Sequence, residues 1–301
     1  MSQKSEPKDI VFRVEEGMDP REILCTTYQM RNFYRQFADG YFSKLDVMNY
    51  MQHHVAAKLC KRGDSVLDVC CGRALMLPLL SYIRPDIDEY IGIDICKSNM
   101  KEAARNKGAC QKLTGFWKDA YTFRITLLEC NVAEMSKKFS ATKRFGTIIY
   151  TASIEHMQKE AAIQSLRECW KLLEIGGTML LTTPNTKREK DEDGYTRRYK
   201  AHLYEWNLEE MRDELVRQGF AIKNTFGLVA DTEEFEEGLS KYPEALEVYN
   251  KYKEYMPGEW LLSFFPVIYP EIASEVAFVC EKDISRQKDY EEEMKRWRES
   301  Q

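Results

Sequence analysis

Short apolar runs alternate with longer amphipathic segments along the middle of the chain. The apolar runs have the length of buried strands. They cover residues 65–69, 90–93, 123–128, 147–150 and 178–182. The amphipathic segments have apolar residues at helical spacing. The longest of them cover residues 75–83, 98–117 and 159–173. Strands that alternate with helices predict an α/β fold, in which helices cover both faces of a mostly parallel sheet.

The same pattern continues toward the C-terminus. A helix is expected over 208–218, and the pair Gly219-Phe220 opens a strand that ends at Val229. Residues 232–256 are helical in pattern and acidic, and a last strand is expected at 275–280. The whole pattern predicts a three-layer sandwich with a seven-stranded sheet and about 45 residues inserted before the last strand.

The two ends of the chain differ from its middle, because the beginning is helical and rich in aromatic residues and the end carries charges of both signs. Three parts are expected: a helical N-terminal lid over 1–49, one α/β domain over 50–283 and a charged tail over 284–301. Two segments of the domain are expected to shape the choice of substrate, at about 186–206 and 230–272.

Composition narrows the possible partners. Apolar residues make up 44% and charged residues 31% of the 301 residues, which is typical of a folded domain rather than a disordered chain. The 44 Lys and Arg residues against 49 Asp and Glu residues give a net charge of −5, so no global field attracts a polyanion. Nucleic acid is therefore a possible partner but not the favoured one.

Cysteine content and hydropathy indicate the compartment. The nine cysteines are odd in number and include no C-x-x-C pair, which favours a reducing environment. The first 30 residues are polar, and no run of about 18 apolar residues occurs. We therefore expect no membrane partner and a cytoplasmic location.

Candidate chemistry lies where the first predicted strand ends. Asp68 is followed by the small-residue turn Cys70-Cys71-Gly72-Arg73-Ala74, and a helix begins after it. Small residues let a ligand approach the backbone, and a helix N-terminus has free N–H groups. Asp94 ends the next strand, 22 residues after Gly72, where an acid can accept both hydroxyls of a ribose. The two acids predict a nucleotide-type cofactor site at this edge of the sheet.

The pair Asp68-x-x-x-Gly72 with Asp94 resembles the class I S-adenosylmethionine (SAM) methyltransferases, whose first motif is D-x-G-x-G-x-G. Cys70 and Ala74 replace two of the motif's glycines by other small residues. The resemblance implies a Rossmann-like fold, SAM as the cofactor and S-adenosylhomocysteine (SAH) as its product. A dinucleotide cofactor fits less well, because only one glycine of G-x-G-x-x-G is present.

Later segments extend this resemblance. Residues 145–150 are similar to the family's fourth strand, residues 172–181 to its fifth strand and the turn before it, and Gly219-Phe220 to the opening of its sixth strand. The cofactor contacts implied by the resemblance are Asp68, Cys70, Gly72, Ala74, Asp94, Ile95, Asn131 and Thr151.

The acceptor side is expected after the fourth strand, where Glu155 and His156 follow the carboxyl edge at which open α/β sheets bind ligands. His156 is a candidate catalytic base, because the reference pKa of histidine lies near neutrality, and Glu155 is a candidate beside it. Methyl transfer is an in-line displacement at a sulfonium, so positioning without a base is the alternative role for both residues.

Glu155, His156 and the later His202 also resemble the metal-dependent small-RNA 3′-terminal 2′-O-methyltransferases. That resemblance implies a divalent ion between the three residues, although Ala152 stands where that family has its first ligand glutamate. Related small-molecule enzymes carry a similar Glu-His pair. We therefore expect no metal and assign His202 to substrate contact.

Residues before the first strand are further candidates. Tyr34 and Tyr41 are expected to wall the substrate site, with core packing as the alternative. His53 and His54 lie on a predicted helix that could form part of the lid. Surface or packing roles are the more common ones for such histidines.

Together, these patterns predict a SAM-dependent methyltransferase that acts on an oxygen or nitrogen of a small molecule. The first alternative is an RNA methyltransferase, including metal-assisted ribose 2′-O-methylation. The second is a non-catalytic partner subunit with the same fold, for which the apolar residues 260–269 would be the contact surface. The oligomeric state stays open, and a homodimer is possible.

Overall fold

The computed structural model of the protein describes residues 43–113, 123–187, 200–283 and 285. Residues 1–43 and 44–301 form two separate compact units, and the described elements belong to the second. Most of the expected lid over 1–49 therefore lies outside the described residues, as does the tail over 284–301 except for Ser285. Both boundaries stay predictions.

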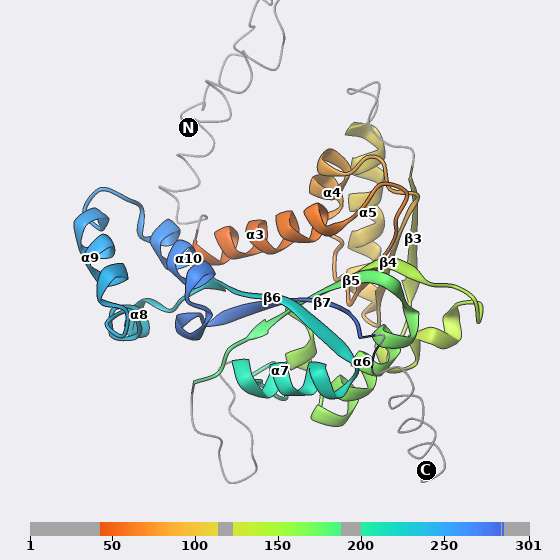
Figure 1. The fold of residues 1–301 in the computed structure, drawn as a ribbon. Helices are drawn as coiled ribbons and strands as arrows, with labels where there is room; N and C mark the ends of the chain where they lie inside the picture. The colour runs from red at the N-terminus through yellow and green to blue at the C-terminus, as the bar shows by residue number, and fades with distance from the viewer. Residues whose placement is uncertain (1–42, 114–122, 188–199, 284, 286–301) are drawn as a thin grey trace, which may run out of the picture. The chain divides into compact units, whose positions relative to one another are not determined.

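Seven strands form one sheet. They are β1 (Ser65–Val69), β2 (Glu89–Asp94), β3 (Arg124–Glu129), β4 (Phe145–Thr151), β5 (Leu173–Pro184), β6 (Phe220–Val229) and β7 (Glu275–Lys282). Their order is β3-β2-β1-β4-β5-β7-β6 (Figure 1). The first five strands are parallel, and β7 runs antiparallel to both of its neighbours. The predicted seven-stranded, mostly parallel sheet is confirmed.

One face of the sheet is covered by α3 (Lys44–Leu59), α4 (Leu77–Ile83) and α5 (Lys97–Leu113) (Figure 1). Strand residues such as Val66 and Ile149 pack there against Ala56 and Leu77 of the helices. Successive side chains of a strand point to opposite faces of the sheet. The strand residues next to Val66 and Ile149 in sequence therefore pack on the other face.

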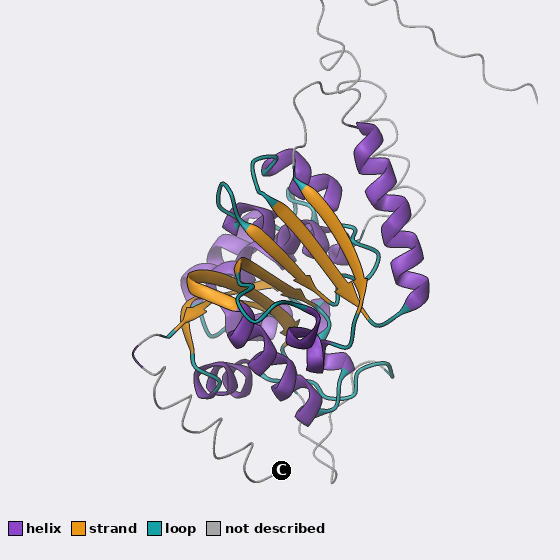
Figure 2. Ribbon diagram, turned by 90° about the vertical axis from the view of Figure 1, so that its right-hand side faces the viewer, coloured by secondary structure: helices purple, strands orange, loops and turns teal. Residues whose placement is uncertain are grey.

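The opposite face is covered by η1 (Val132–Lys138), α6 (Lys159–Leu172) and α7 (Leu208–Arg217), and the short η2 (Ile154–His156) follows β4. Leu67 and Ile148 pack there against Leu166 and Met211. Figure 2 shows helices on both sides of the strands, so the predicted three-layer sandwich is confirmed.

The segment between β6 and β7 forms α8 (Thr232–Leu239), α9 (Pro243–Tyr252), α10 (Gly258–Ile268) and η3 (Pro270–Ile272). Its apolar cluster includes Phe235, Leu261 and Phe265, and α10 also packs against α3 and β6. The predicted insertion before the last strand is confirmed. The apolar run at 260–269 thus belongs largely to α10, and part of it fills this cluster. None of the helices in the described ranges is long and apolar enough to cross a membrane.

Candidate functional site

A cavity of about 580 Å³ opens at the carboxyl ends of β1, β2 and β4. Small-molecule sites commonly have volumes of roughly 300–1,000 Å³. The chain passes from β1 to β2 and β3 on one side and later to β4 on the other. The cavity therefore lies at the topological switch point of the sheet, where open α/β folds bind their ligands.

The turn after β1 has an unusual backbone. Cys70, Gly72 and Ala74 all have a positive φ, of 55°, 53° and 53°. A non-glycine residue in this conformation is strained by roughly 1–2 kcal/mol, and such strain is common at ligand sites. A Cβ atom built on Gly72 would meet no atom within 4 Å, so the backbone there faces open space. The turn can therefore receive a ligand close to its main chain.

Asp94 holds this turn from the end of β2. Its Oδ2 accepts a hydrogen bond from the Gly72 N–H at 2.9 Å, and its Oδ1 accepts one from the Cys96 N–H at 2.7 Å. The Asp94 side chain is 8% exposed and lines the cavity. A carboxylate oxygen can accept more than one hydrogen bond, so Asp94 keeps capacity for the hydroxyl groups of a ligand.

Asp68 lies at the end of β1 and also lines the cavity. The Tyr90 hydroxyl donates to its Oδ2 at 2.5 Å. Burial raises the pKa of Asp68 to about 7, and the nearby Asp94 adds to this effect, whereas the Tyr90 hydrogen bond opposes it. The Asp68 carboxyl group is thus harder to ionise than an exposed aspartate.

We expect Asp68→Asn to stabilise the protein at pH 8 and to change its stability little at pH 4. The unfolded carboxyl ionises near its ordinary pKa of 3.8, but the folded one near 7, so the acid lowers stability as the pH rises between these values. The difference corresponds to at most roughly 4 kcal/mol, which the uncharged amide removes. Urea unfolding at pH 4, 6 and 8 measures it. An equal gain at every pH would contradict this explanation.

Two cysteines of the turn, Cys70 and Cys71, line the cavity. Burial raises the pKa of both thiols above the ordinary range. Because the thiolate is the form that binds metals and attacks electrophiles, neither thiol is favoured as a metal ligand or a nucleophile.

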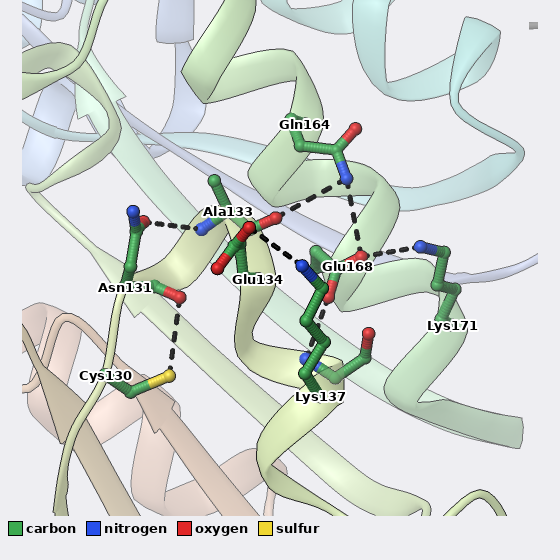
Figure 3. A network of polar contacts seen from close by, with 9 residues as sticks. Cys130, Asn131, Ala133, Glu134, Lys137, Gln164, Glu168 and Lys171 are labelled. Atoms are coloured by element: carbon green, nitrogen blue, oxygen red, sulfur yellow. Dashed lines mark hydrogen bonds and ion pairs between the residues drawn. The ribbon is translucent and has the colours of Figure 1, made fainter. Parts of the chain in front are cut away.

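The loop after β3 is held from α6. Asn131 Oδ1 accepts the Ala133 N–H at 3.0 Å and caps η1. On α6, Glu168 accepts the Ser136 N–H at 2.8 Å, and the Gln164 amide donates to the Ala133 carbonyl at 3.5 Å (Figure 3). These bonds fix the segment whose Asn131 and Ala133 line the cavity.

The turn after β4 is also strained and also braced. Ala152 has a φ of 44°, and its N–H donates to both the carbonyl and the hydroxyl oxygen of Thr182 on β5, at 3.1 and 3.0 Å. The Thr182 hydroxyl donates in turn to Gln52 Oε1 on α3 at 2.9 Å. Hydrogen bonds therefore join α3, β4 and β5 at the cavity.

Glu155, His156 and His202 come together beside the cavity. One ligand-type atom of each residue lies within 4.8 Å of those of the other two. His156 Nδ1 lies 3.0 Å from the Ala201 carbonyl oxygen, and His202 Nδ1 lies 2.6 Å from Glu205 Oε1. A carbonyl or carboxylate oxygen can only accept a hydrogen bond, so each Nδ1 is the donor. Burial raises the pKa of Glu155.

The structure gathers most of the residues that the sequence singled out. Seven of the eight predicted cofactor contacts line the cavity: Asp68, Cys70, Gly72, Asp94, Ile95, Asn131 and Thr151. The eighth, Ala74, is completely buried outside the lining. His156 lines the cavity, whereas Glu155 and His202 are buried beside His156 and are not lining residues. Tyr34 and Tyr41 lie outside the described residues.

Sequence reasoning missed several lining residues, among them Asn49 and Gln52 of α3. His53 beside them lines the cavity as well; it was a candidate for the lid, with a surface or packing role as the more common expectation. Burial lowers the pKa of His53 to about 4, so its ring is neutral at pH 7. Residues at i, i+3 and i+4 share one helix face, and this polar face before the first strand was the available signal.

Three solved structures share the fold. The [4+2]-cyclase SpnF has a TM-score of 0.52 and 16% identity, over 77% of this chain and 80% of its own. A SAM-dependent methyltransferase from Archaeoglobus fulgidus has a TM-score of 0.50 and 17% identity, over 83% of this chain and all of its own. The small RNA methyltransferase HEN1 has a TM-score of 0.52 and 16% identity over 78% of this chain, which spans only 25% of HEN1. At such identities the likeness establishes the fold alone. The curated proteins include no match.

A family model gives a more specific result. The model described as the mRNA (guanine-N(7))-methyltransferase domain matches residues 15–256. The match contains the strained turn after β1, Asp94 and the turn after β4, which together line the cavity. The chain therefore belongs to the mRNA (guanine-N(7))-methyltransferase domain family, within the class I methyltransferases that use SAM as their cofactor.

Proposed function

We propose that the protein transfers the methyl group of SAM to a nitrogen or oxygen of a compact acceptor, either a free small molecule or one exposed base. The observation that supports this most directly is the cavity, in which residues for a nucleotide-type cofactor and His156 line one continuous space. The guanine base in the family's description is one acceptor of this size.

The residues present fit SAM. Open space over Gly72 leaves room for a ligand against the main chain, and Asp94 has acceptor capacity for the two ribose hydroxyls. Ile95 and Asn131 line the same cavity and would flank the adenine. When bound, SAM supplies a methyl group on a positively charged sulfur, which makes that carbon electrophilic.

The chain's own residues would then position the acceptor. In its neutral form the His156 ring, whose Nδ1–H faces the Ala201 carbonyl, has its lone pair on Nε2 and can take a proton from an acceptor hydroxyl. If the acceptor atom is instead a ring nitrogen with a free lone pair, no base is needed. Placement of that nitrogen in line with the methyl group is then sufficient.

The test begins with titration calorimetry of the full chain with SAH. Labelled SAM is then supplied with two acceptor sets, a small-molecule extract and an RNA with an unmethylated guanosine cap. Micromolar SAH binding together with a labelled product would support the proposal and identify the acceptor class. A folded protein that does not bind SAH would contradict it.

The cluster of Glu155, His156 and His202 supports a second candidate function, metal-assisted methylation of a ribose hydroxyl. Two imidazoles and a carboxylate form a donor set that suits Mn²⁺, Fe²⁺, Co²⁺ and Zn²⁺. In a metal-binding histidine, the ring nitrogen that does not hold the metal commonly donates a hydrogen bond that orients the ring. His156 has such a bond to the Ala201 carbonyl, and His202 has one to the Glu205 carboxylate. A bound ion would lower the pKa of a hydroxyl that it coordinates.

Under this second candidate, we expect the full chain to bind Mn²⁺ with a micromolar dissociation constant and His202→Ala to weaken that affinity at least tenfold. Calorimetry with MnCl₂ measures both values. His54→Ala is the matched control, because His54 is no member of the cluster. Equal Mn²⁺ affinities for His202→Ala and the wild type would remove the metal-assisted function and leave the leading proposal intact.

A further inference from the structure

We propose that the outer face of α10 binds a basic amphipathic helix of a separate protein. The outer face consists of Trp260, Phe264, Val267 and Ile268, which stand at helical positions i, i+4, i+7 and i+8. Residues at this spacing form one row along a helix. Their side chains are 46%, 58%, 41% and 54% exposed, so the row faces the solvent. None of the four lines the cavity, and the inference does not depend on the proposed function.

The fold uses only the other side of α10. Leu261 and Phe265 are buried in the cluster that α10 forms with α8 and α9, and α10 also packs on α3 and β6. A single exposed apolar side chain is ordinary, but a group of them marks an interaction site. Eight of the fifteen large apolar side chains that are exposed in the described part of the chain lie within residues 248–268. The packing of the described elements does not explain this concentration.

Aromatic contacts join the outer face to the two neighbouring helices. The ring of Phe264 lies 5.6 Å from that of Phe265, between ring centroids. Phe265 in turn contacts Phe235 of α8 at 6.0 Å and Tyr249 of α9 at 6.1 Å. Figure 1 shows α8, α9 and α10 gathered at one end of the sheet. The charges of α8 and α9 therefore belong to the same surface region as the outer face.

This region holds the negative charge of the chain. Residues 230–274, between β6 and β7, include ten Asp and Glu residues but only three Lys residues and no Arg. Their net charge is −7, whereas that of the whole chain is −5, so all other residues together total +2. Glu259 directly precedes Trp260 of the outer face. Such a local field attracts positively charged partners.

Several of these acids have no partner within the described chain. Glu234 and Glu236 each pair with a lysine, at 3.7 and 3.4 Å. Glu237 and Glu247 are exposed and form no ion pair with any described residue. Both lie beyond the first turns of α8 and α9, where the helix dipole would stabilise an acid. Their charges therefore remain available to the cations of a partner.

Charge also decides between the possible occupants. Nucleic acids and anionic membranes have the same sign of charge as this surface, so both are repelled. A second copy in a two-fold contact would bring a second charge of −7 against the first. The segments outside the described residues supply no positive charge, because the net charge is −1 for 1–42 and zero for each of the later ones. The occupant is therefore a separate, basic protein segment.

The shape of the surface favours a helical occupant. The apolar row follows α10, whose 11 residues (Gly258–Ile268) have a length of about 16 Å. An amphipathic helix has a straight apolar row of the same kind, and two such rows pack along each other. Lysine or arginine residues at the edges of the partner's apolar row would then lie against the carboxylates of the insertion.

The probe is a fluorescein-labelled peptide of about 14 residues, slightly longer than α10, with leucines at helical spacing and lysines at the other positions. Its matched control has glutamates in place of the lysines. Fluorescence anisotropy with the full chain at about 0.1 M salt measures both affinities. We expect a micromolar dissociation constant for the lysine peptide and at least 20-fold weaker binding of the glutamate peptide. Equal affinities for the two peptides would overturn the proposal.

One set of variants tests the apolar row. Phe264→Ser and Trp260→Ser should each weaken binding of the lysine peptide at least tenfold. The matched control is Tyr82→Ser, which removes a ring of α4 that is 79% exposed and should leave the affinity within twofold of the wild type. Thermal unfolding shows that the variants are folded. Wild-type affinity in both Phe264→Ser and Trp260→Ser would mean that the peptide binds elsewhere.

A second set tests the charges. Glu237→Gln combined with Glu247→Gln should weaken binding of the lysine peptide at least threefold. Glu160→Gln combined with Glu174→Gln removes the same charge from α6 and the start of β5 and should have a smaller effect. Equal losses in the two double variants would reduce the attraction to net charge alone and contradict a specific surface. Sedimentation equilibrium of the full chain without peptide tests the second copy, because a dimer that Phe264→Ser dissociates would contradict a separate partner.

Discussion

Asp94→Ala is expected to weaken SAH binding at least 100-fold while the protein stays folded. The Asp94 carboxylate would accept the two ribose hydroxyls, and a hydrogen bond to a charged group contributes about 1.5–3 kcal/mol. The loss of both exceeds about 2.8 kcal/mol, which corresponds to a factor of 100 in affinity. The change also removes the acceptor that holds the Gly72 N–H at 2.9 Å, so the turn after β1 loses its anchor on β2.

The measurement is calorimetry with SAH, and the neighbouring strand offers a matched control. Glu129 ends β3 and is paired in register with Asp94, but its carboxylate points to an exposed contact with Lys97 at 3.7 Å. Glu129→Ala should bind SAH as the wild type does. Asp94→Asn keeps the shape without the charge and should lose roughly tenfold. An Asp94→Ala affinity within threefold of the wild type would mean that the carboxylate holds only the protein's own turn.

The lining of the cavity by the ends of β1 and β2 was predictable because its signals are local. Asp68 and Asp94 lie at the carboxyl ends of β1 and β2, Gly72 lies in the turn after β1, and parallel strands bring their carboxyl ends to one edge. Seven predicted contacts thus line one cavity. Ala74 was predicted from its place in the motif, but a motif does not specify which side of a turn a residue faces. Its side chain packs with Met76 and Leu77 in the core.

The side of the cavity formed by α3 depends on contacts between residues far apart in the sequence. Gln52, which lines the cavity, accepts a hydrogen bond from Thr182, 130 residues later, and no periodicity of α3 indicates that partner. The low pKa of His53 could not be predicted from the sequence either, because it results from burial that only the packed fold provides. The proximity of His202 to Glu155 was predictable only from the resemblance, and the structure gives the distance.

The largest loss of stability is expected at Gly227, far from any motif. A Cβ atom on this residue of β6 would lie 2.5 Å from Ala273 Cβ and 2.7 Å from both the Cβ and the carbonyl oxygen of Pro266. Backbone atoms cannot rotate away as a flexible side chain can, so α10 or the segment before β7 must shift. We therefore expect Gly227→Ala to lower the free energy of unfolding by about 3 kcal/mol, at the upper end of overpacking effects.

Thermal unfolding of Gly227→Ala checks this value, with a fall in Tm of roughly 6–12 °C for a domain of this size. Gly258→Ala is the control, because a Cβ atom there meets nothing within 4 Å and alanine favours the first turn of α10. A Gly227→Ala protein as stable as this control would show that α10 does not press on β6.

The same variant connects the insertion to the site. α10 packs on α3 as well as on β6, and α3 carries Gln52 and His53 at the cavity. If Gly227→Ala displaces α10, the support of α3 at the cavity weakens, while Asp94 and the turn after β1 keep their own hydrogen bonds. SAH affinity should then change less than threefold, and the yield of labelled product from SAM should fall. Equal losses of both would mean that the two halves of the cavity respond to the insertion as one body.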